Sequence, residues 1–511
     1  MSRKSLILLT VCMATLTINL STMIVNVALP TLAAELDAGT RDLLWIVDGY
    51  NLAFAALVLA MGSLSDRFGR RPALIGGLVG FGASSAAAAL TDSSGALIAC
   101  RVAMGVFAAV IFPTTLSIIS NTFSDRRERA TALGLWGAAV GLGVALGPVT
   151  GGLLLEHSSW QSIFWAQVPV ALLTAGLAVA FVPESRDPSV PPIDRAGFAT
   201  SVAALGTLTW TIIEAPEHGW SSTETLTGFA VAAVLLAAFV LVERRVEHPM
   251  IDVTLFADRR FSAACASVTI AFFALFGFVF LITQFFQFVR GYDPLETGLR
   301  FLPVALAIAV ASVVGSQLAP RLGTKLVVAP GLFLLGGAFL WISFIPADVS
   351  YASVVVPQML LLGSGIGLVS TPATEAILQV LPPARAGVGS AVNDATRELG
   401  GTLGVAVVGS LFSSLYSDKL LDLVEGRLPA DLAEKAADSV GFADVLAARV
   451  PTLGAAVDTA FLDGFGLACT VVGLLCVVGG TAALVALPGN GYDPAEQQAS
   501  DDEPAPATAA G

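Results

Sequence analysis

Ionisable side chains are scarce inside the long apolar runs of this chain, and the few that occur there could carry charge across a membrane. Asp48 lies near one end of an apolar run, and Asp394, Arg397 and Glu398 fall together in another. Arg101 lies within a third run. A charge in such a segment is costly unless it faces a partner or water, so these residues are candidates for function. A carboxyl group taken out of water is pushed toward its neutral form and can load and release a proton.

Two interpretations of the group formed by Asp394, Arg397 and Glu398 stay open. Asp394 and Glu398 are four residues apart and therefore share one face of a helix. Arg397 could hold Asp394 in a fixed ion pair that only stabilises the helix. Glu398 has no obvious local partner, so it is our favoured proton carrier, with Asp394 and Asp48 as further candidates. Glu375 lies near the end of its run, where water can solvate it.

A stripe without side chains is the second chemical feature, in the stretch from Gly141 to Gly152. Gly143, Gly147 and Gly151 recur every fourth residue and line one helical face, which lets a neighbouring helix approach to backbone contact. Pro148 leaves one carbonyl without its usual donor and favours a kink. A dinucleotide-binding loop is not expected, since no strand precedes the stretch. The alternative is a tightly packed membrane helix with no special role.

A short polar turn packs an acid and three arginines between two apolar runs. Its acid can accept hydrogen bonds from a neighbouring arginine or a helix N-terminus, which would form a charge lock that opens and closes. Alternatively the arginines only anchor the turn to the membrane surface. A similar stretch, Arg321 to Lys325, has Pro320 in the acid's place, so we do not expect a second lock there. The residues of the predicted lock are Gly62, Asp66, Arg67, Gly69, Arg70 and Arg71.

The composition indicates a polytopic membrane protein. Of 511 residues, 55% are hydrophobic and only 13% are charged. Much of the acid behind the net charge of −13 lies outside the apolar runs, so nucleic-acid binding is not supported. The five cysteines lie in apolar runs without metal-ligand spacing, so we expect packing roles and no metal site.

Hydropathy predicts about fourteen membrane-spanning helices, since a bilayer needs about 20 apolar residues per span. We expect an N-terminal six-helix bundle at 1–195, an inserted helix pair with its linker at 196–260, and a C-terminal six-helix bundle at 261–487. The C-terminal bundle includes an external loop at 414–460. Residues near 430–449, rich in Ala, Leu, Glu and Lys, predict helical stretches within this loop. The loop could cap the outer opening, although we rather expect a partly ordered, solvated loop. The tail at 488–511 should be disordered.

Basic residues in the short loops predict that both termini are cytoplasmic. In the loops on the other side, such as 31–43, 155–162 and 347–352, Arg41 is the only lysine or arginine. The N-terminus is read as an uncleaved first span, since no cleavage site follows it. The basic residues on the cytoplasmic side, besides Arg3 and Lys4, are Arg67, Arg70, Arg71, Arg126, Arg127, Arg129, Arg244, Arg245, Arg259, Arg260, Arg321 and Lys325.

A phenylalanine-rich run at 261–287 could line a cavity for large apolar compounds, which need area more than specific hydrogen bonds. Packing against neighbouring helices or lipid is the more common role of such a stripe. The residues that we expect at a substrate cavity are Asn26, Tyr50, Phe276, Gln284, Gln287 and Arg397.

These motifs together resemble the major facilitator superfamily, and within it the fourteen-span drug:proton antiporters of the EmrB/QacA type. The glycine stripe resembles the fifth-helix antiporter motif of these exporters, with Gly152 completing it, and the polar turn resembles their loop 2–3 signature. The stretch around Arg101 resembles their fourth-helix motif, with Met104 replacing the usual glutamine. That likeness implies a role for Arg101 in proton relay, and a structural salt bridge is an equally good reading. One departure is Ser21, where the family usually has an aspartate.

The resemblance implies a major facilitator fold in the cytoplasmic membrane and export of lipophilic, often cationic, drugs or antibiotics in exchange for protons. Ser21 weakens the expectation of cationic substrates and leaves proton handling to Asp48, Asp394 and Glu398. The alternative function is proton-coupled uptake or uniport of a small metabolite. We expect no enzyme activity, since no nucleophile–base pair, metal cluster or phosphate loop is present in the sequence. We also expect no cofactor and a monomer.

Overall fold

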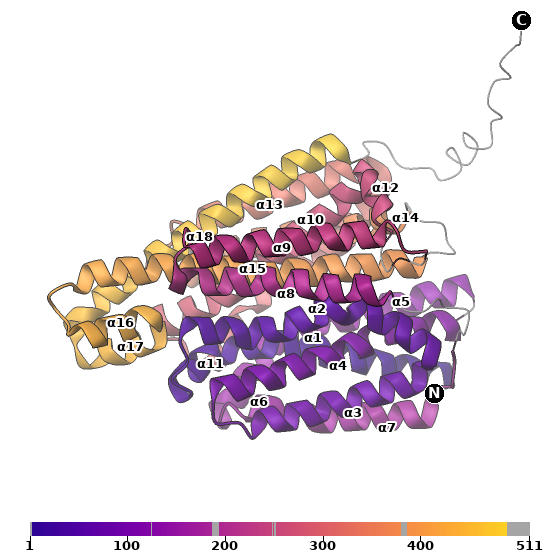
Figure 1. Ribbon diagram of the computed structural model, residues 1–511, viewed down its shortest axis with the longest axis horizontal. Helices are drawn as coiled ribbons and strands as arrows, with labels where there is room; N and C mark the ends of the chain where they lie inside the picture. Colours follow the sequence, from indigo (N-terminus) through magenta and orange to yellow (C-terminus); the bar gives the residue numbers. More distant parts are fainter. Residues whose placement is uncertain are drawn as a thin grey trace, which may run out of the picture.

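The computed structural model describes residues 3–123, 125–186, 194–247, 249, 252–379 and 386–487, and every regular element in them is a helix (Figure 1). Thirteen of these helices are long and apolar enough to cross a membrane, and a helix pair bent by 57° brings the number to 14. Helices prevail because a membrane offers no water to satisfy free backbone groups. The all-α polytopic fold and its span count are thus confirmed. The predicted disordered tail lies outside the described residues.

The first half of the chain forms seven helices. Prolines inside three of them, Pro30, Pro113 and Pro148, are tolerated because neighbouring helices support the backbone. The bent pair is α2, which divides into Thr40–Val58 and Ala60–Phe68. The helices are α1 (Arg3–Glu35), α2 (Thr40–Phe68), α3 (Arg70–Ala89), α4 (Ser94–Thr122), α5 (Arg126–His157), α6 (Ser162–Trp165) and α7 (Gln167–Phe181).

The inserted pair and the second half follow. The inserted helices are α8 (Arg195–His218) and α9 (Thr223–Glu243), joined by a turn in which Ser222 caps α9 by accepting from Thr225 N. The second half contains η1 (Val253–Ala257), α10 (Arg259–Gln284), the π-helical turn η2 (Phe285–Val289), α11 (Pro294–Arg300), α12 (Leu302–Leu322), α13 (Lys325–Ile342), η3 (Tyr351–Val355), α14 (Val356–Gln379), α15 (Ala386–Val424), α16 (Ala430–Asp438), α17 (Val440–Arg449) and α18 (Pro451–Ala486).

The two halves repeat the same packing. In the first half the main helix pairs are α1 with α5, α2 with α4, α3 with α4, and α3 with α7. In the second half the corresponding pairs are α10 with α15, α12 with α14, α13 with α14, and α13 with α18. This correspondence is the internal repeat typical of transporters.

The halves meet along two seams. One joins α2 to α15, and the other joins α5 to α11. Helix α8 packs against both α2 and α15, so the inserted pair covers the first seam, whereas α9 packs mainly on α8. Near the start of α2, Arg41 Nε pairs with Glu214 of α8 at 2.7 Å, and Arg41 Nη1 pairs with Glu217 at 3.0 Å.

The helical stretches predicted near 430–449 are present as α16 and α17, but the rest of the segment 414–460 is not the partly ordered loop that we expected. Helix α15 continues to Val424, α18 starts at Pro451, and α16 and α17 lie between them. These two short helices project at one end of the molecule and pack on the turn between α1 and α2 (Figure 1). Buried alanines of α16, such as Ala433 and Ala436, supply the apolar face that a solvated loop would lack.

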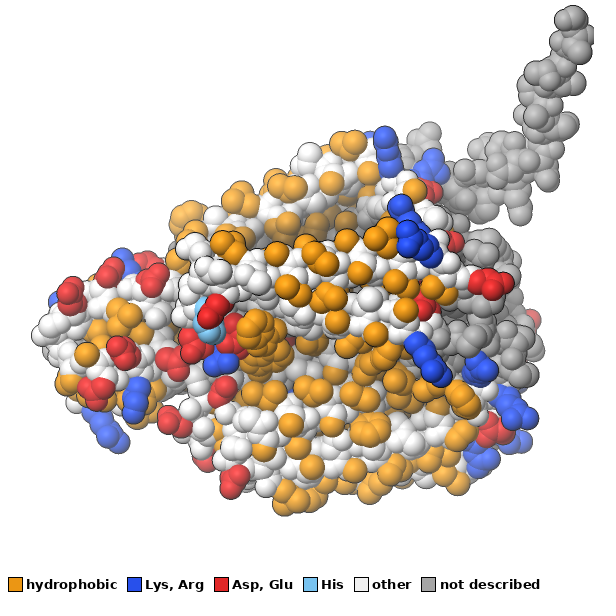
Figure 2. All heavy atoms as spheres, viewed as in Figure 1, with side chains coloured by type: hydrophobic (Ala, Val, Ile, Leu, Met, Phe, Trp, Pro, Cys, Tyr) orange, Lys and Arg blue, Asp and Glu red, His pale blue; other side chains and the backbone are white. Residues whose placement is uncertain are grey.

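The surface is consistent with a membrane environment. Exposed leucines, valines and phenylalanines are spread along the helices, and Figure 2 shows this hydrophobic surface between two charged ends. Most lysines and arginines in that view gather at the end where α1 begins, here called the terminal end. Acidic side chains are plentiful at the opposite end, here called the α16–α17 end. The cytoplasmic location of the termini stays a prediction.

Candidate functional site

Arg101 lies on α4, fully buried, at the point where α1 and α2 cross that helix. Its Nε donates to the carbonyl of Ile46 at 2.9 Å, and its Nη1 donates to Ser21 Oγ at 3.4 Å. The guanidinium carbon lies 4.3 Å from the centre of the Tyr50 ring, a cation–π contact. Its Nη2 has no hydrogen-bond partner among the described residues. The structural salt bridge considered for Arg101 is therefore not formed with any described carboxylate.

Asp48 faces the seam between α2 and α15. Leu44, one turn before it, packs against Gly409 of α15, and Asn51 follows on the same helical stripe. Asp48 and Asn51 are both fully buried, and the Asn51 side chain lies beside the Asp48 carboxyl without a hydrogen bond of normal geometry; no cation pairs with Asp48 in the described structure. A carboxyl group buried in this way is costly in its charged form.

The cluster on α15 does not form the fixed ion pair that the spacing allowed. The Arg397 guanidinium stacks on Phe272 of α10, 4.5 Å from the ring centre, and its Nε lacks a partner among the described groups. Asp394 and Glu398 act on Arg397 only through longer-range electrostatic attraction. Glu398 Oε2 has no partner there either, and Glu398 lies within electrostatic range of Tyr50 on α2. Glu398 is thus within electrostatic range of the tyrosine that covers Arg101.

The glycine stripe of α5 packs against α1, as the spacing predicted. A Cβ at Gly143 would lie 2.7 Å from Asn19 Cβ, and a Cβ at Gly147 would lie 2.5 Å from Met23 Cβ. Both distances are too short for any side chain, so the two backbones need these glycines. Gly151 packs on α1 in the same way, against Ile24.

The end of this motif belongs to the second seam. A Cβ on Gly152 would collide with the backbone of Pro294 in α11, and one on Gly298 of α11 would collide with the Pro148 carbonyl. The motif therefore has two contacts, one within the first half and one between the halves. Sequence reasoning found the first contact and missed the second, because the glycine of α11 follows no recognisable pattern.

The polar turn after α2 forms the ion pair predicted for it. Arg70 Nε lies 2.6 Å from Asp66 Oδ1, and Arg71 Nη2 donates to the carbonyl of Val179 in α7 at 2.5 Å. Gly69 has a φ of +128°, which strongly favours glycine. Gly62 packs on Pro113, and the Arg67 guanidinium lies over its neighbour's ring, Phe68. These contacts all lie within the first half, and whether they open during transport stays a prediction.

The second copy of this turn, from Arg321 to Lys325, also bends at a glycine. Gly323 has a φ of +87°. Neither basic residue has an ion pair within the described ranges, in agreement with the absence of an acid at Pro320.

The residues expected at a substrate cavity lie mainly along the central contact between α1, α10 and α15. Gln287 Nε2 donates to the Val27 carbonyl of α1 at 2.8 Å and so joins the two halves. Asn26 donates to Thr22 O and leaves its own Oδ1 unpaired in the described structure, while Phe276 packs on Gly401. Gln284 is buried and donates to the backbone of its own helix. Their role in substrate binding stays a prediction.

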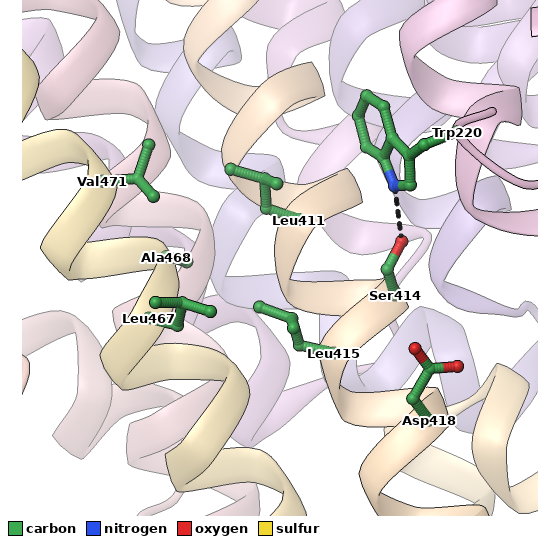
Figure 3. Close-up of a pocket in the computed structure, with 8 residues that line it drawn as sticks. All are labelled: Trp220, Leu411, Ser414, Leu415, Asp418, Leu467, Ala468 and Val471. Carbon is green, nitrogen blue, oxygen red and sulfur yellow. Dashed lines mark hydrogen bonds between the residues drawn. The ribbon is translucent and has the colours of Figure 1, made fainter.

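One pocket of about 330 Å³ lies elsewhere, beside the inserted pair (Figure 3). Trp220 closes it from the α8–α9 turn and donates from Nε1 to Ser414 Oγ of α15 at 3.0 Å. Sequence reasoning did not predict this pocket, because its walls come from three distant segments. The other lining residues are Leu411, Leu415, Asp418, Leu467, Ala468 and Val471.

Comparison with known proteins decides the family. The sequence matches the family model of the Major Facilitator Superfamily over residues 11–405. This chain belongs to that superfamily. It is 36% identical to the multidrug resistance protein Stp of Mycobacterium tuberculosis over 410 residues, covering 80% of this chain and 76% of that one.

Two further comparisons, one of sequence and one of fold, cover nearly the whole chain. The tetracenomycin C resistance and export protein of Streptomyces glaucescens is 34% identical over 518 residues, covering 99% of this chain and 95% of that one. A crystal structure of a bacterial homologue of the lysosomal transporter Spinster, inward-facing and occupied, superposes with a TM-score of 0.68 at 14% identity, covering 95% and 97%. The major facilitator fold and the multi-pass location in the membrane are thereby confirmed.

Members of the superfamily are transporters, so the fold gives no reason to expect an enzyme. Among the residues that the structure describes, no three His, Cys, Asp or Glu side chains are grouped as metal ligands.

Proposed function

We propose that this chain is a proton-coupled antiporter that exports lipophilic drugs or antibiotics across the cell membrane. The observation that supports this most is that a carboxyl group lies in the core of each half without a salt bridge in the described structure, Asp48 on α2 and Glu398, whose Oε2 is buried, on α15. The relatives described above are named for multidrug resistance and for antibiotic export. Neither an enzyme nor a cofactor-dependent role is part of the proposal.

The charges suggest how protons drive the cycle. The described state closes the α2–α15 seam and leaves the Asp48 carboxyl without a described cationic partner. Such a seam closes more readily when the buried carboxyls carry protons, because an unpaired charge there is costly. Proton release then leaves charged carboxylates that favour reopening. If the α16–α17 end faces outside, protons taken up there favour this closed state, and their release inside prepares the exporting step.

Efflux from cells tests the proposal. The gene is expressed in a bacterial host lacking its major drug exporters, and resistance and efflux are measured for ethidium and chloramphenicol, with and without a protonophore. We expect lower accumulation of at least one compound, and the protonophore should abolish the difference. Higher accumulation of a compound on expression would favour uptake, and no protonophore-sensitive change with a broad panel would contradict the proposal.

A further inference from the structure

Arg101 is a buried cation whose surroundings are neutral. Its contacts are the Ile46 carbonyl, the Ser21 hydroxyl and the Tyr50 ring, and all three residues are fully buried. Neutral dipoles solvate a guanidinium but do not cancel its charge. Removing a charge from water without a counter-charge is strongly unfavourable, so a group this deep normally has an acidic partner.

The acids of the core do not supply that partner. Ile46 and Tyr50 are four residues apart and direct one face of α2 toward α4, whereas Asp48 lies between them and points to the other side. Glu398 lies on α15, has no hydrogen bond or ion pair with Arg101 in the described structure, and is attracted to Arg397 of its own helix. The described structure therefore provides a fixed positive charge with no fixed negative charge beside it.

The unused hydrogen-bonding capacity points in the same direction. A guanidinium has a planar fork of donors that suits a carboxylate with two parallel hydrogen bonds. Here one fork nitrogen, Nη2, has no described acceptor, and the other, Nη1, makes a 3.4 Å contact to Ser21. That contact is long for a charged donor, which prefers about 2.7–2.9 Å.

We propose that Arg101 binds an anionic group of the exported compound, a carboxylate or phenolate, with Ser21 and Tyr50 as its neutral neighbours. The inference rests on the export function proposed above and assigns its substrate class. Tyr50 contacts Arg101 and is within electrostatic range of Glu398, so movement of its ring would admit the anion beside a carboxyl group that can bind a proton. Ser21 is then a specificity residue, because a carboxylate in its place would satisfy Arg101 from within.

The test compares two dyes with one ring skeleton, fluorescein, which is anionic, and rhodamine 123, which is cationic. Uptake is measured in energised inverted vesicles containing the wild type, Ser21→Asp or Ser21→Asn. We expect the wild type to transport fluorescein, and Ser21→Asp to shift the fluorescein-to-rhodamine ratio at least about tenfold toward the cation, since the new carboxylate competes at high effective concentration. Ser21→Asn has nearly the same shape without the charge and should shift the ratio less than about threefold.

A competition in the wild type keeps the test independent of the folding of these variants. Salicylate should inhibit fluorescein transport at least about tenfold more strongly than salicylamide, which lacks the carboxylate. Equal inhibition would overturn the inference, as would equal ratio shifts in the two Ser21 variants.

Three further outcomes separate the possible failures. Protonophore-sensitive transport of rhodamine 123 or chloramphenicol without fluorescein would overturn the anion site and leave the export function standing. Transport of none of these compounds would overturn both. If chloride, but not fluorescein, raises the thermal stability of the purified protein above that in gluconate, Arg101 binds an inorganic anion, and the substrate assignment fails.

Discussion

At the scale of single residues, Glu398 is the group whose neutralisation is most informative. It is central, its Oε2 has no described partner, and it lies within electrostatic range of Tyr50. We expect Glu398→Gln to lower protonophore-sensitive efflux at least about tenfold while expression stays normal, because a glutamine cannot carry the proton. Efflux and substrate-induced proton release are measured in the same vesicles.

Glu375→Gln is the matched control, since Glu375 lies on α14 and less deep in the protein than Glu398. It should keep more than about half of the wild-type efflux, because a group that water reaches can exchange protons freely. Unimpaired coupling in Glu398→Gln, or equal losses in both variants, would remove Glu398 as the carrier.

The sequence predicted the burial of Asp48, Arg101 and Asp394, but it could not predict their partners. The spacing of Asp394 and Arg397 allowed an ion pair, yet Arg397 stacks on Phe272 instead, a residue over a hundred positions away. The contacts of Arg101 with Ser21, Ile46 and Tyr50 join three helices. No local pattern encodes such contacts, because they depend on how the helices cross.

At the scale of helices, the α5 stripe predicts a sharp difference between two glycines of one helix. A side chain at Gly147 would collide with α1, whereas a Cβ at Gly141 meets no atom within 4 Å. We expect Gly147→Leu to cost about 1–3 kcal/mol of stability and most of the transport, because overpacking separates α1 from α5. Gly141→Leu should change neither.

Thermal unfolding of the purified variants, together with efflux, measures both effects. Full activity of Gly147→Leu would mean that the stripe is incidental to transport. Comparable losses in Gly141→Leu would mean that the effect comes from bulk and not from the contact with α1.

The α16–α17 end predicts a pH-dependent contact. Thr40 Oγ1 of α2 donates to the Asp438 carbonyl at 3.0 Å, and Ser439 Oγ donates to the Ala38 carbonyl at 3.4 Å. A Cβ at Gly39 would collide with the Asp438 carboxyl group, so this acid lies directly against the α1–α2 turn. The contact joins the second half of the chain to the first.

Partial desolvation and the neighbouring acids Glu217, Asp42 and Asp37 raise the pKa of Asp438, and only Arg41 opposes them. A raised pKa in the closed contact means that protonation stabilises it. The stabilisation is full below the ordinary aspartate pKa and is lost as the pH rises through the raised value. The contact should therefore be tighter in acid and looser at neutral and alkaline pH.

Spin labels at Lys435→Cys on α16 and Asp92→Cys on the α3–α4 turn report this opening. We expect longer distances at pH 8 than at pH 5, and a weaker response once Asp438→Asn is added. An unchanged pH response in that variant would assign the effect to other groups.

Helices were the most predictable level of the structure. Long apolar runs determined the spans, since each run must satisfy its backbone internally. The short helices α16 and α17 were predicted from composition, but their packing was not, because their apolar face is made of small residues such as Ala433 and Ala436 and gains its stability from neighbouring segments.

At the scale of the whole molecule, the repeated packing of the two halves creates two related seams, α2 with α15 and α5 with α11. The first contains Asp48 and is covered by α8, and the second contains the glycine motif. Opening both seams together would expose the central acids to the opposite side. The repeat was predictable from the paired polar turns, whereas the position of α8 over a seam was not, because hydropathy does not encode which helices are neighbours.

The most direct test of the account is transport driven by a pH gradient alone. Purified protein in liposomes with an acidic lumen is given ethidium, a permanent cation, and chloramphenicol, a neutral compound, neither of which is trapped by pH. We predict accumulation of at least one of them in the lumen, its loss when the gradient is collapsed, and its absence in Glu398→Gln. Accumulation only when the lumen is alkaline, or movement indifferent to the gradient, would contradict proton-driven export.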